Sequence, residues 1–256
     1  MNLTFDREKA YGYTSHSQII RVLTESWVEG NVFCPRCGCA RMKHFPNNQA
    51  VADFYCPACQ NQYELKSKSG MIGKKIADGA YSTFLQRITG DNNPDFFVLR
   101  YSAADLCVED LFVIPKHFFT PEMVEKRKPL AANARRAGWV GCNILIEKIP
   151  DQGKIPIVKD HVPVEKDIVI KNVQKSTLLH TTNIESRGWL MDILNCINQM
   201  EGDTFTLAEV YEKEQIFHLK YPQNHNIRPK IRQQLQILRD KNFIEFLGQG
   251  VYRKLE

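Results

Sequence analysis

Apolar positions near the start of the chain recur at the three- and four-residue spacing of a helix face. Ile19, Leu23 and Trp27 share such a face, and this predicts a helix over residues 17–29. Farther along, short apolar runs bounded by turn residues predict strands over residues 50–55, 62–66, 96–101, 111–114, 142–146 and 155–158. Residues 74–88 and 121–124 are expected to be helical. Helices mixed with short strands indicate an α/β or α+β domain.

The pattern changes toward the end of the chain. Residues 160–186 show little periodicity and are interpreted as a connector. Helices are predicted over residues 189–200 and 226–241. Between them, a further helix is predicted to begin at the capping box of Thr206 and Glu209. Strands over residues 243–247 and 251–254 flank a turn. Because three helices followed by a hairpin are typical of a winged helix, we expect two domains, at residues 1–183 and 184–256.

Composition is that of a folded soluble protein. Apolar residues make up 43% of the 256 positions and charged residues 25%, which argues against disorder. The longest apolar runs are far shorter than the roughly 18 residues of a membrane span. The N-terminal residues lack the apolar segment of a signal peptide. The net charge of +5 permits nucleic acid as a partner without requiring it.

Four of the eight cysteines form two C-x-x-C pairs that are separated by eighteen residues. They are Cys34 with Cys37 and Cys56 with Cys59. This pattern is typical of a zinc ribbon, because each pair can turn two thiolates toward one ion and two pairs complete a tetrahedron. Disulfides and redox-active pairs are the alternatives, and the lack of a secretory signal argues against disulfides. We expect a structural zinc site, with Cys39 as a spare thiol.

Asp53, Glu64 and Lys66 form the candidate catalytic set. Glu64 and Lys66 lie two residues apart in a predicted strand, so their side chains point to one face, and Asp53 lies in the strand before. Carboxylate oxygens suit Mg²⁺, and a neighbouring lysine can orient or deprotonate an attacking water. The spacing alone is a weak match, and solvated charges at an exposed strand end are the alternative.

Two basic segments are candidates for DNA contact. In the helix over residues 226–241 an apolar stripe leaves polar faces that can enter a major groove. Its candidate contacts are Arg228, Lys230, Arg232, Gln233 and Gln236. In the basic loop the candidates are Arg135, Arg136 and Trp139, whose indole face offers apolar area to methyl groups. A solvated basic face and an ordinary core tryptophan are the alternatives.

Longer strings of the sequence resemble a known family. The chain is similar to the DpnI-like methyl-directed (type IIM) restriction endonucleases of the PD-(D/E)xK nuclease superfamily. The similarity lies in both cysteine pairs and in the strings VADFYC, YELKSKSG, DGAYSTFLQR and KIRQQLQILRDK. Asp53, Glu64 and Lys66 match the superfamily motif, with Ala52 where proline is common. The resemblance covers nearly the whole chain and weakens over residues 160–185.

The resemblance implies an α/β PD-(D/E)xK restriction-endonuclease-like core with an embedded four-cysteine zinc site, followed by an all-α/winged-helix C-terminal domain. It implies a type II restriction endonuclease that hydrolyses double-stranded DNA at GATC sites with N6-methylated adenine and leaves blunt ends. Catalytic Mg²⁺ would be held by Asp53, Glu64 and the carbonyl of Leu65, and Zn²⁺ would be structural. Glu25, in the first helix, is a further candidate near the Mg²⁺, and a solvated helix face is the alternative that is favoured for it.

The implied partner is double-stranded DNA with methylated GATC, and we expect no membrane and no obligate protein partner. A prokaryotic cytoplasm follows from the family alone. One buried methyl group contributes only ~0.8 kcal/mol, so we expect the winged helix and the nuclease domain both to read the methyl groups. The alternative is a non-cleaving methyl-DNA reader, against which the intact set of Asp53, Glu64 and Lys66 argues.

Overall fold

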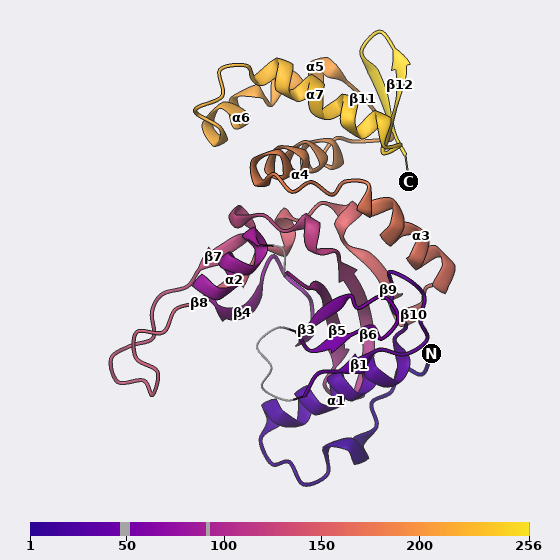
Figure 1. Cartoon of the computed structure of the whole chain (residues 1–256), viewed down its shortest axis with the longest axis vertical. Helices are drawn as coiled ribbons and strands as arrows, with labels where there is room; N and C mark the ends of the chain where they lie inside the picture. Colours follow the sequence, from indigo (N-terminus) through magenta and orange to yellow (C-terminus); the bar gives the residue numbers. More distant parts are fainter. Residues whose placement is uncertain (47–51, 91–92, 256) are drawn as a thin grey trace. The chain divides into compact units, whose positions relative to one another are not determined.

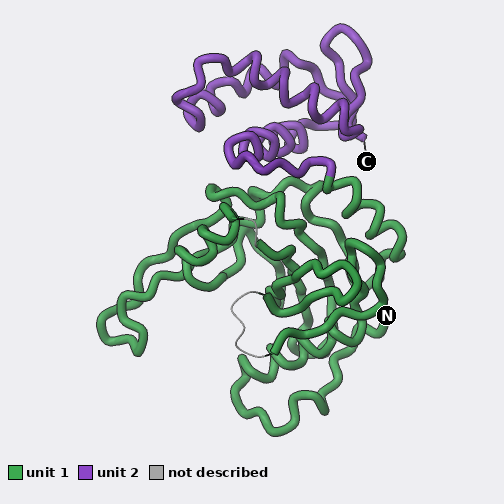
Figure 2. The backbone as a smooth tube through the Cα atoms, viewed as in Figure 1, with its two compact units in different colours: residues 1–177 green, residues 178–256 purple. Residues whose placement is uncertain are grey.

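The computed structural model describes residues 1–46, 52–90 and 93–255, and the chain divides into two compact units. One unit spans Met1–Thr177 and the other Leu178–Glu256 (Figure 2). The predicted domain boundary after residue 183 stays a prediction.

The first unit is built on a seven-stranded sheet in the order β1-β2-β3-β5-β6-β9-β10 (Figure 1). Its strands are β1 (Lys43–His44), β2 (Phe54–Tyr55), β3 (Gln62–Ser69), β5 (Asp95–Ser102), β6 (Cys107–Ile114), β9 (Ile155–Lys159) and β10 (Val162–Pro163). β3 and β5 are parallel, and the other neighbours are antiparallel. Four strand predictions are confirmed as β3, β5, β6 and β9. The strand predicted over residues 50–55 is shorter as β2, and residues 50–51 lie outside the described part.

One face of this sheet is covered by two helices. Tyr63 and Phe97 stack there with 4.7 Å between ring centroids. They belong to a buried cluster with Trp27 of α1 (His16–Asn31) and Val169 of α3 (Lys166–Thr177). The helix predicted over residues 17–29 is therefore confirmed as α1.

The opposite face carries the even-numbered positions of β3. Phe96, the partner of Glu64 on β5, packs edge-on against Phe84 of α2 (Tyr81–Thr89), with 5.7 Å between ring centroids. Before α2, β4 (Ile76–Ala80) pairs with β8 (Gly141–Ile144), and β8 pairs with β7 (Val124–Lys126), in a second sheet. The helix predicted over residues 74–88 is wrong in its first half, because pairing with β8 overrides local helical preference.

The predicted connector over residues 160–186 is also wrong, because it contains β10, α3 and the start of α4 (Ile184–Asn198). α3 buries Val169, Val173 and Ser176. This stripe is narrow, and its β-branched residues are poor helix formers, so it does not stand out in a polar sequence. The remaining elements of the first unit are the 3-10 turns η1 (Arg7–Ala10), η2 (Lys116–Phe118), η3 (Pro121–Met123), η4 (Ile146–Lys148) and η5 (Asp151–Gly153).

The second unit combines helices with a three-stranded sheet in the order β11-β13-β12. Besides α4, its elements are β11 (Thr204–Thr206), α5 (Leu207–Glu212), α6 (Glu214–Lys220), α7 (Ile227–Asp240), β12 (Ile244–Gly248) and β13 (Val251–Lys254). The predicted capping box is confirmed, since Glu209 N–H donates to the Thr206 hydroxyl at 3.2 Å and Thr206 N–H to the Glu209 carboxylate at 2.6 Å. α6 and β11 were not predicted.

α7 packs through the expected stripe. Ile227, Ile231, Leu235 and Leu238 are at most 2% exposed. Trp189 of α4 is fully buried and stacks on Tyr221, with 4.0 Å between ring centroids. Across residues 1–46, 52–90 and 93–255, no helix combines the length and the apolar character that crossing a membrane requires.

Candidate active site and metal centre

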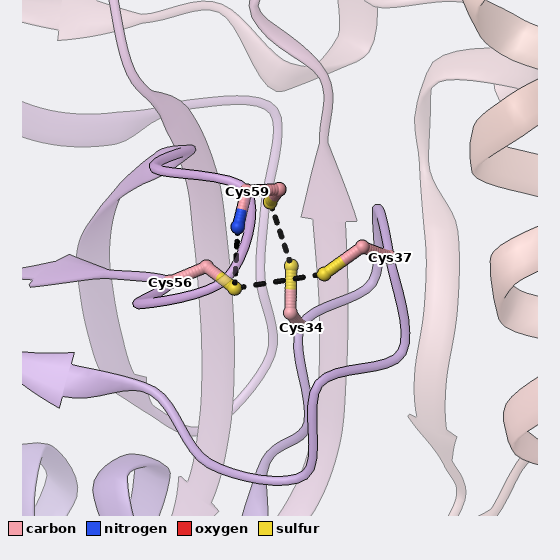
Figure 3. A group of neighbouring side chains, drawn as sticks. All are labelled: Cys34, Cys37, Cys56 and Cys59. Atoms are coloured by element: carbon pink, nitrogen blue, oxygen red, sulfur yellow. Dashed lines mark hydrogen bonds between the residues drawn. The ribbon is translucent and has the colours of Figure 1, made fainter.

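The four cysteines of the two C-x-x-C pairs come together in one cluster (Figure 3). Their sulfur atoms all lie within 4.8 Å of one another, with 3.6 Å between Cys34 and Cys59 and 3.6 Å between Cys37 and Cys56. Zn–S bonds of about 2.3 Å in a tetrahedron give sulfur–sulfur edges of about 3.8 Å, so the cluster can hold a zinc ion. Cys39 lies outside the cluster, and its thiol contacts the carbonyl of Arg41.

Backbone turns shape both pairs for a metal. The N–H of Gly38 donates to the carbonyl of Cys34 at 2.8 Å, and the N–H of Gln60 donates to the carbonyl of Cys56 at 2.9 Å. Burial raises the pKa of Cys34, and it raises the pKa of Cys59 to about 11. These thiols therefore need a neighbouring cation to become thiolates at neutral pH, as metal ligands must.

A chain of hydrogen bonds ties the second cysteine pair to the central sheet. Asn61, two residues after Cys59, donates to the buried carboxylate of Asp95 at 2.7 Å. Asp95 also accepts the N–H of Lys116 at 2.8 Å. Arg36, inside the first pair, donates to the side-chain oxygen of Asn61 at 3.0 Å. The turn that carries the second pair is thereby fixed to β5.

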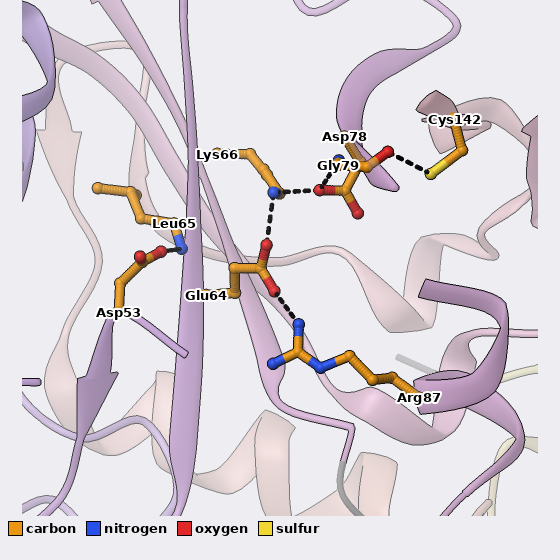
Figure 4. A network of polar contacts seen from close by, with 8 residues as sticks. All are labelled: Asp53, Glu64, Leu65, Lys66, Asp78, Gly79, Arg87 and Cys142. Atoms are coloured by element: carbon orange, nitrogen blue, oxygen red, sulfur yellow. Dashed lines mark hydrogen bonds and ion pairs between the residues drawn. The ribbon is translucent and has the colours of Figure 1, made fainter. Parts of the chain in front are cut away.

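Asp53 lies immediately before β2 and beside β3. Its N–H donates to the carbonyl of Tyr63 at 3.0 Å, and its carboxylate accepts the N–H of Leu65 at 2.6 Å (Figure 4). The side chain thus occupies the place of a strand partner at this edge of β3. The N–H and the carbonyl of one strand residue point to the same edge, so the carbonyl of Leu65 faces the side of Asp53.

Glu64 and Lys66 lie side by side on one face of β3, as their two-residue spacing predicts. Nζ of Lys66 is 2.5 Å from Oε1 of Glu64, and each side chain is 16% exposed (Figure 4). The ammonium also lies 5.8 Å from the centre of the Phe96 ring. The pair is thus largely withdrawn from solvent.

Two further side chains extend this pair into a network, and neither was predicted. Asp78 of β4 accepts from the ammonium of Lys66, and Arg87 of α2 donates to Oε2 of Glu64 at 3.1 Å. Burial lowers the pKa of Lys66, but the carboxylates of Glu64 and Asp78 outweigh it and raise that pKa overall. Burial raises the pKa of Glu64 in spite of its cationic neighbours. Charges thus alternate along Asp78, Lys66, Glu64 and Arg87.

The oxygens at β3 have the chemistry that Mg²⁺ prefers, but they do not form a complete cage. Among the described residues, the four cysteines are the one group of three or more His, Cys, Asp or Glu side chains whose ligand atoms converge. Asp53, Glu64 and the carbonyl of Leu65 nevertheless supply hard oxygens at neighbouring positions, and Mg²⁺ usually keeps several waters. The donor set therefore fits Mg²⁺ with part of its shell left to water and substrate.

Glu25 of α1 is paired with a neighbouring histidine. Its carboxylate lies 3.2 Å from Nε2 of His44 and 3.9 Å from Arg21. Glu25 and Leu65 both line a cavity of about 260 Å³. Glu25 therefore lies near β3, but within the described part of the chain it forms no hydrogen bond or ion pair with Glu64 or Lys66.

The basic loop between β7 and β8 is held by its own backbone. Leu130 donates to the carbonyl of Trp139 at 2.9 Å and accepts the N–H of Gly138 at 3.0 Å. The guanidinium of Arg136 lies over the Trp139 ring, 4.2 Å from its centre. Arg135 and Arg136 are exposed and Trp139 is half-buried, so the indole is not an ordinary core residue.

The polar face of α7 is exposed at Arg228, Arg232, Gln233 and Gln236, and half-buried at Lys230. Tyr211 of α5 supports two of these side chains, with the guanidinium carbons of Arg228 and Arg232 at 4.9 and 5.7 Å from its ring centre. The Tyr211 hydroxyl accepts from Arg232, and Glu214 accepts from Nε of Arg228 at 2.8 Å. These roles of Tyr211 and Glu214 were not predicted, because both residues lie outside α7, the helix that the sequence pattern identifies as basic.

Two family models match the chain. The DpnI model, described as the Dam-replacing family, matches residues 1–182, and the DpnI_C model, described as the Dam-replacing HTH domain, matches residues 185–254. The resemblance inferred from the sequence is thereby confirmed. These matches support a methylation-dependent restriction nuclease that binds DNA through a helix-turn-helix domain. The chain belongs to the DpnI, or Dam-replacing, family.

Proposed function

We propose that the protein is a type II restriction endonuclease that cuts double-stranded DNA at GATC sites with N6-methylated adenine and leaves blunt ends. The proposal depends mainly on one observation, the pairing of Lys66 with Glu64 at 2.5 Å on β3, beside Asp53, in a chain of this family. The GATC sequence, the blunt ends and the prokaryotic cytoplasm come from the family resemblance. No protein partner is part of the proposal.

In this proposal Asp53, Glu64 and the carbonyl of Leu65 would hold Mg²⁺, which would neutralise charge that develops on the phosphate. Asp53 is preorganised, because its carboxylate already accepts the N–H of Leu65 at 2.6 Å. Lys66 carries its ammonium between the carboxylates of Glu64 and Asp78. An ammonium in that position is suited to orient the attacking water or to donate to a phosphate oxygen.

We assign a structural role to zinc bound by Cys34, Cys37, Cys56 and Cys59. Four thiolates close the coordination shell, so no position stays open for substrate. The second cysteine pair lies between Asp53 and Glu64 in the sequence. Zinc would therefore fix the turn that joins the two halves of the catalytic set.

We propose two readers of the methyl groups. In the nuclease domain the reader is the loop with Arg135, Arg136 and Trp139. In the winged helix it is α7, with Arg228, Lys230, Arg232, Gln233 and Gln236 facing the major groove. At one reader, two methyl groups contribute only about 1.6 kcal/mol, which corresponds to a roughly sixteenfold preference for methylated over unmethylated DNA. A second reader multiplies that preference.

The test is cleavage of one plasmid, prepared with and without adenine methylation at GATC, in the presence of Mg²⁺. We expect cutting of the methylated form alone, and loss of cutting in Lys66→Ala with DNA binding retained. Binding of the methylated plasmid without cutting by the parent protein would favour the non-cleaving reader. Equal cutting of both forms would support the nuclease activity but contradict recognition of the methyl groups.

A further inference from the structure

Asp78 reaches the catalytic strand from a different sheet. β4 pairs with β8 and not with β3, yet the carboxylate of Asp78 accepts from the ammonium of Lys66 (Figure 4). The Asp78 side chain is only 4% exposed, less than the 16% of Lys66. A carboxylate this buried is costly unless its partners are fixed.

The backbone fixes Asp78 independently of Lys66. Its carboxylate accepts the N–H of Gly79 at 2.7 Å. Asp78 lies opposite Cys142 in the β4–β8 pair, and the thiol of Cys142 contacts the carbonyl of Gly79 at 3.6 Å. The ladder shifts register between Asp78 and Ala80, a bulge that redirects a side chain. The carboxylate is therefore a fixed acceptor to which the flexible lysine side chain comes.

Glu64 has more than one task in the proposed function, because it would be a metal ligand as well as the partner of Lys66. It would hold Mg²⁺ although its Oε1 already contacts Lys66 and its Oε2 already contacts Arg87. Asp78 is not among the proposed ligands and remains available to Lys66. A lysine side chain held by one fixed carboxylate loses much of its rotamer freedom before substrate arrives.

We propose that Asp78 is a positioning residue, which holds the ammonium of Lys66 in its working place while Glu64 binds the metal. This inference rests on the proposed nuclease function. Asp78 touches neither DNA nor metal in this scheme and acts only through Lys66. The sheet that supplies Asp78 also supplies β7 and β8, which flank the loop with Trp139.

The test uses the full chain with Asp78→Asn and Asp78→Ala. Single-turnover cleavage of a methylated GATC duplex is measured with Mg²⁺, and binding of the same duplex is measured with Ca²⁺ in its place. Removing a group that orients a site residue typically costs about 10- to 100-fold in activity. We expect that loss in the cleavage rate for Asp78→Ala, a smaller loss for Asp78→Asn, and dissociation constants within about twofold of the parent.

Glu125→Gln is the matched control, because Glu125 lies in the same small sheet and pairs with Lys75 at 2.8 Å, outside the catalytic set. It should cleave as the parent does. Parent-like cleavage by Asp78→Ala, while Lys66→Ala is inactive, would overturn the inference. So would equal losses in rate and binding, or an equal loss in Glu125→Gln, since these indicate a general structural role. Active Lys66→Ala would instead refute the proposed function.

Discussion

The hydroxyl of Tyr63 lies 3.1 Å from Sγ of Cys34. Tyr63 is the residue before Glu64 on β3, it is fully buried, and its carbonyl accepts the N–H of Asp53 at 3.0 Å. One side chain therefore contacts the cysteine cluster while its backbone holds one member of the catalytic set and precedes another. Through this contact, zinc in the proposed site would influence the catalytic strand without taking part in cleavage.

We expect Cys56→Ser combined with Cys59→Ser to abolish cleavage. Losing two of four ligands should release the zinc, and the energy of a structural zinc site is folding energy. Zinc content, the thermal transition of the nuclease unit and cleavage of methylated DNA are the measurements. Cys39→Ser is the control, because Cys39 lies outside the cluster. A zinc-free double variant that cleaves like the parent would contradict the coupling.

Arg87 is expected to stabilise the fold through Glu64. Arg87→Met removes the partner at 3.1 Å from a carboxylate that is 16% exposed but keeps Lys66, and losing a hydrogen bond to a charged group typically costs about 1.5–3 kcal/mol. Urea unfolding measures the free energy. Arg87→Lys keeps the charge without the planar fork, so we expect an intermediate loss. An Arg87→Met protein as stable as the parent would show that the pair contributes nothing.

The sequence was sufficient where function depends on local spacing. Cys34 and Cys37 turn toward one point because two residues separate them. Glu64 and Lys66 share a face because the strand period is two. The buried stripe of α7 follows from the helical period in the same way. In each case the residues that act together are also neighbours along the chain.

The residues that were missed act across the fold. The helix predicted over residues 74–88 includes Asp78, and only pairing with Cys142 in β8 places Asp78 beside Lys66. Tyr211 was one aromatic residue in an ordinary helix, and only the approach of α5 to α7 puts it under Arg228. Unlike the two cysteine pairs, Asp78 and Tyr211 belong to no motif of known spacing, so only tertiary packing reveals their partners.

Trp139 is expected to contribute to methyl discrimination. In Trp139→Ala, we expect the ratio of methylated to unmethylated cleavage to fall by up to roughly sixteenfold, the value of two buried methyl groups. Trp139→Phe keeps an aromatic face and should retain part of the ratio. Initial rates on both plasmids give the measurement in the full chain. An unchanged ratio in a folded Trp139→Ala protein would exclude the indole as a methyl reader.

Tyr211 is expected to hold two arginines of α7 ready for DNA. Tyr211→Ala removes a ring that lies 4.9 Å from Arg228 and 5.7 Å from Arg232. An exposed cation–π contact contributes about 0.5–1 kcal/mol, so binding should weaken by about two- to fivefold. The salt dependence should stay the same, because no phosphate-neutralising charge is lost. Arg232→Ala should instead reduce the salt slope by about one, and equal slopes in the two variants would contradict this division of roles.

The capping box of α5 should make stability depend on pH. Hydrogen bonds from the Thr206 side chain and then from its backbone N–H lower the pKa of Glu209. A lowered folded-state pKa gives stability that is present above the unfolded-state pKa and is lost as pH falls through the folded-state value. The parent should therefore exceed Glu209→Gln in stability at pH 7, and the difference should shrink steadily below about pH 4.5.

Thermal unfolding of both proteins at several pH values measures this difference. Glu212→Gln, at the other end of α5, removes the same charge without touching the cap. If the loss of stability at low pH comes from the cap, it should disappear in Glu209→Gln and persist in Glu212→Gln. A constant difference between the parent and Glu209→Gln from pH 7 to pH 3 would mean that the carboxylate caps the helix no better than the neutral amide.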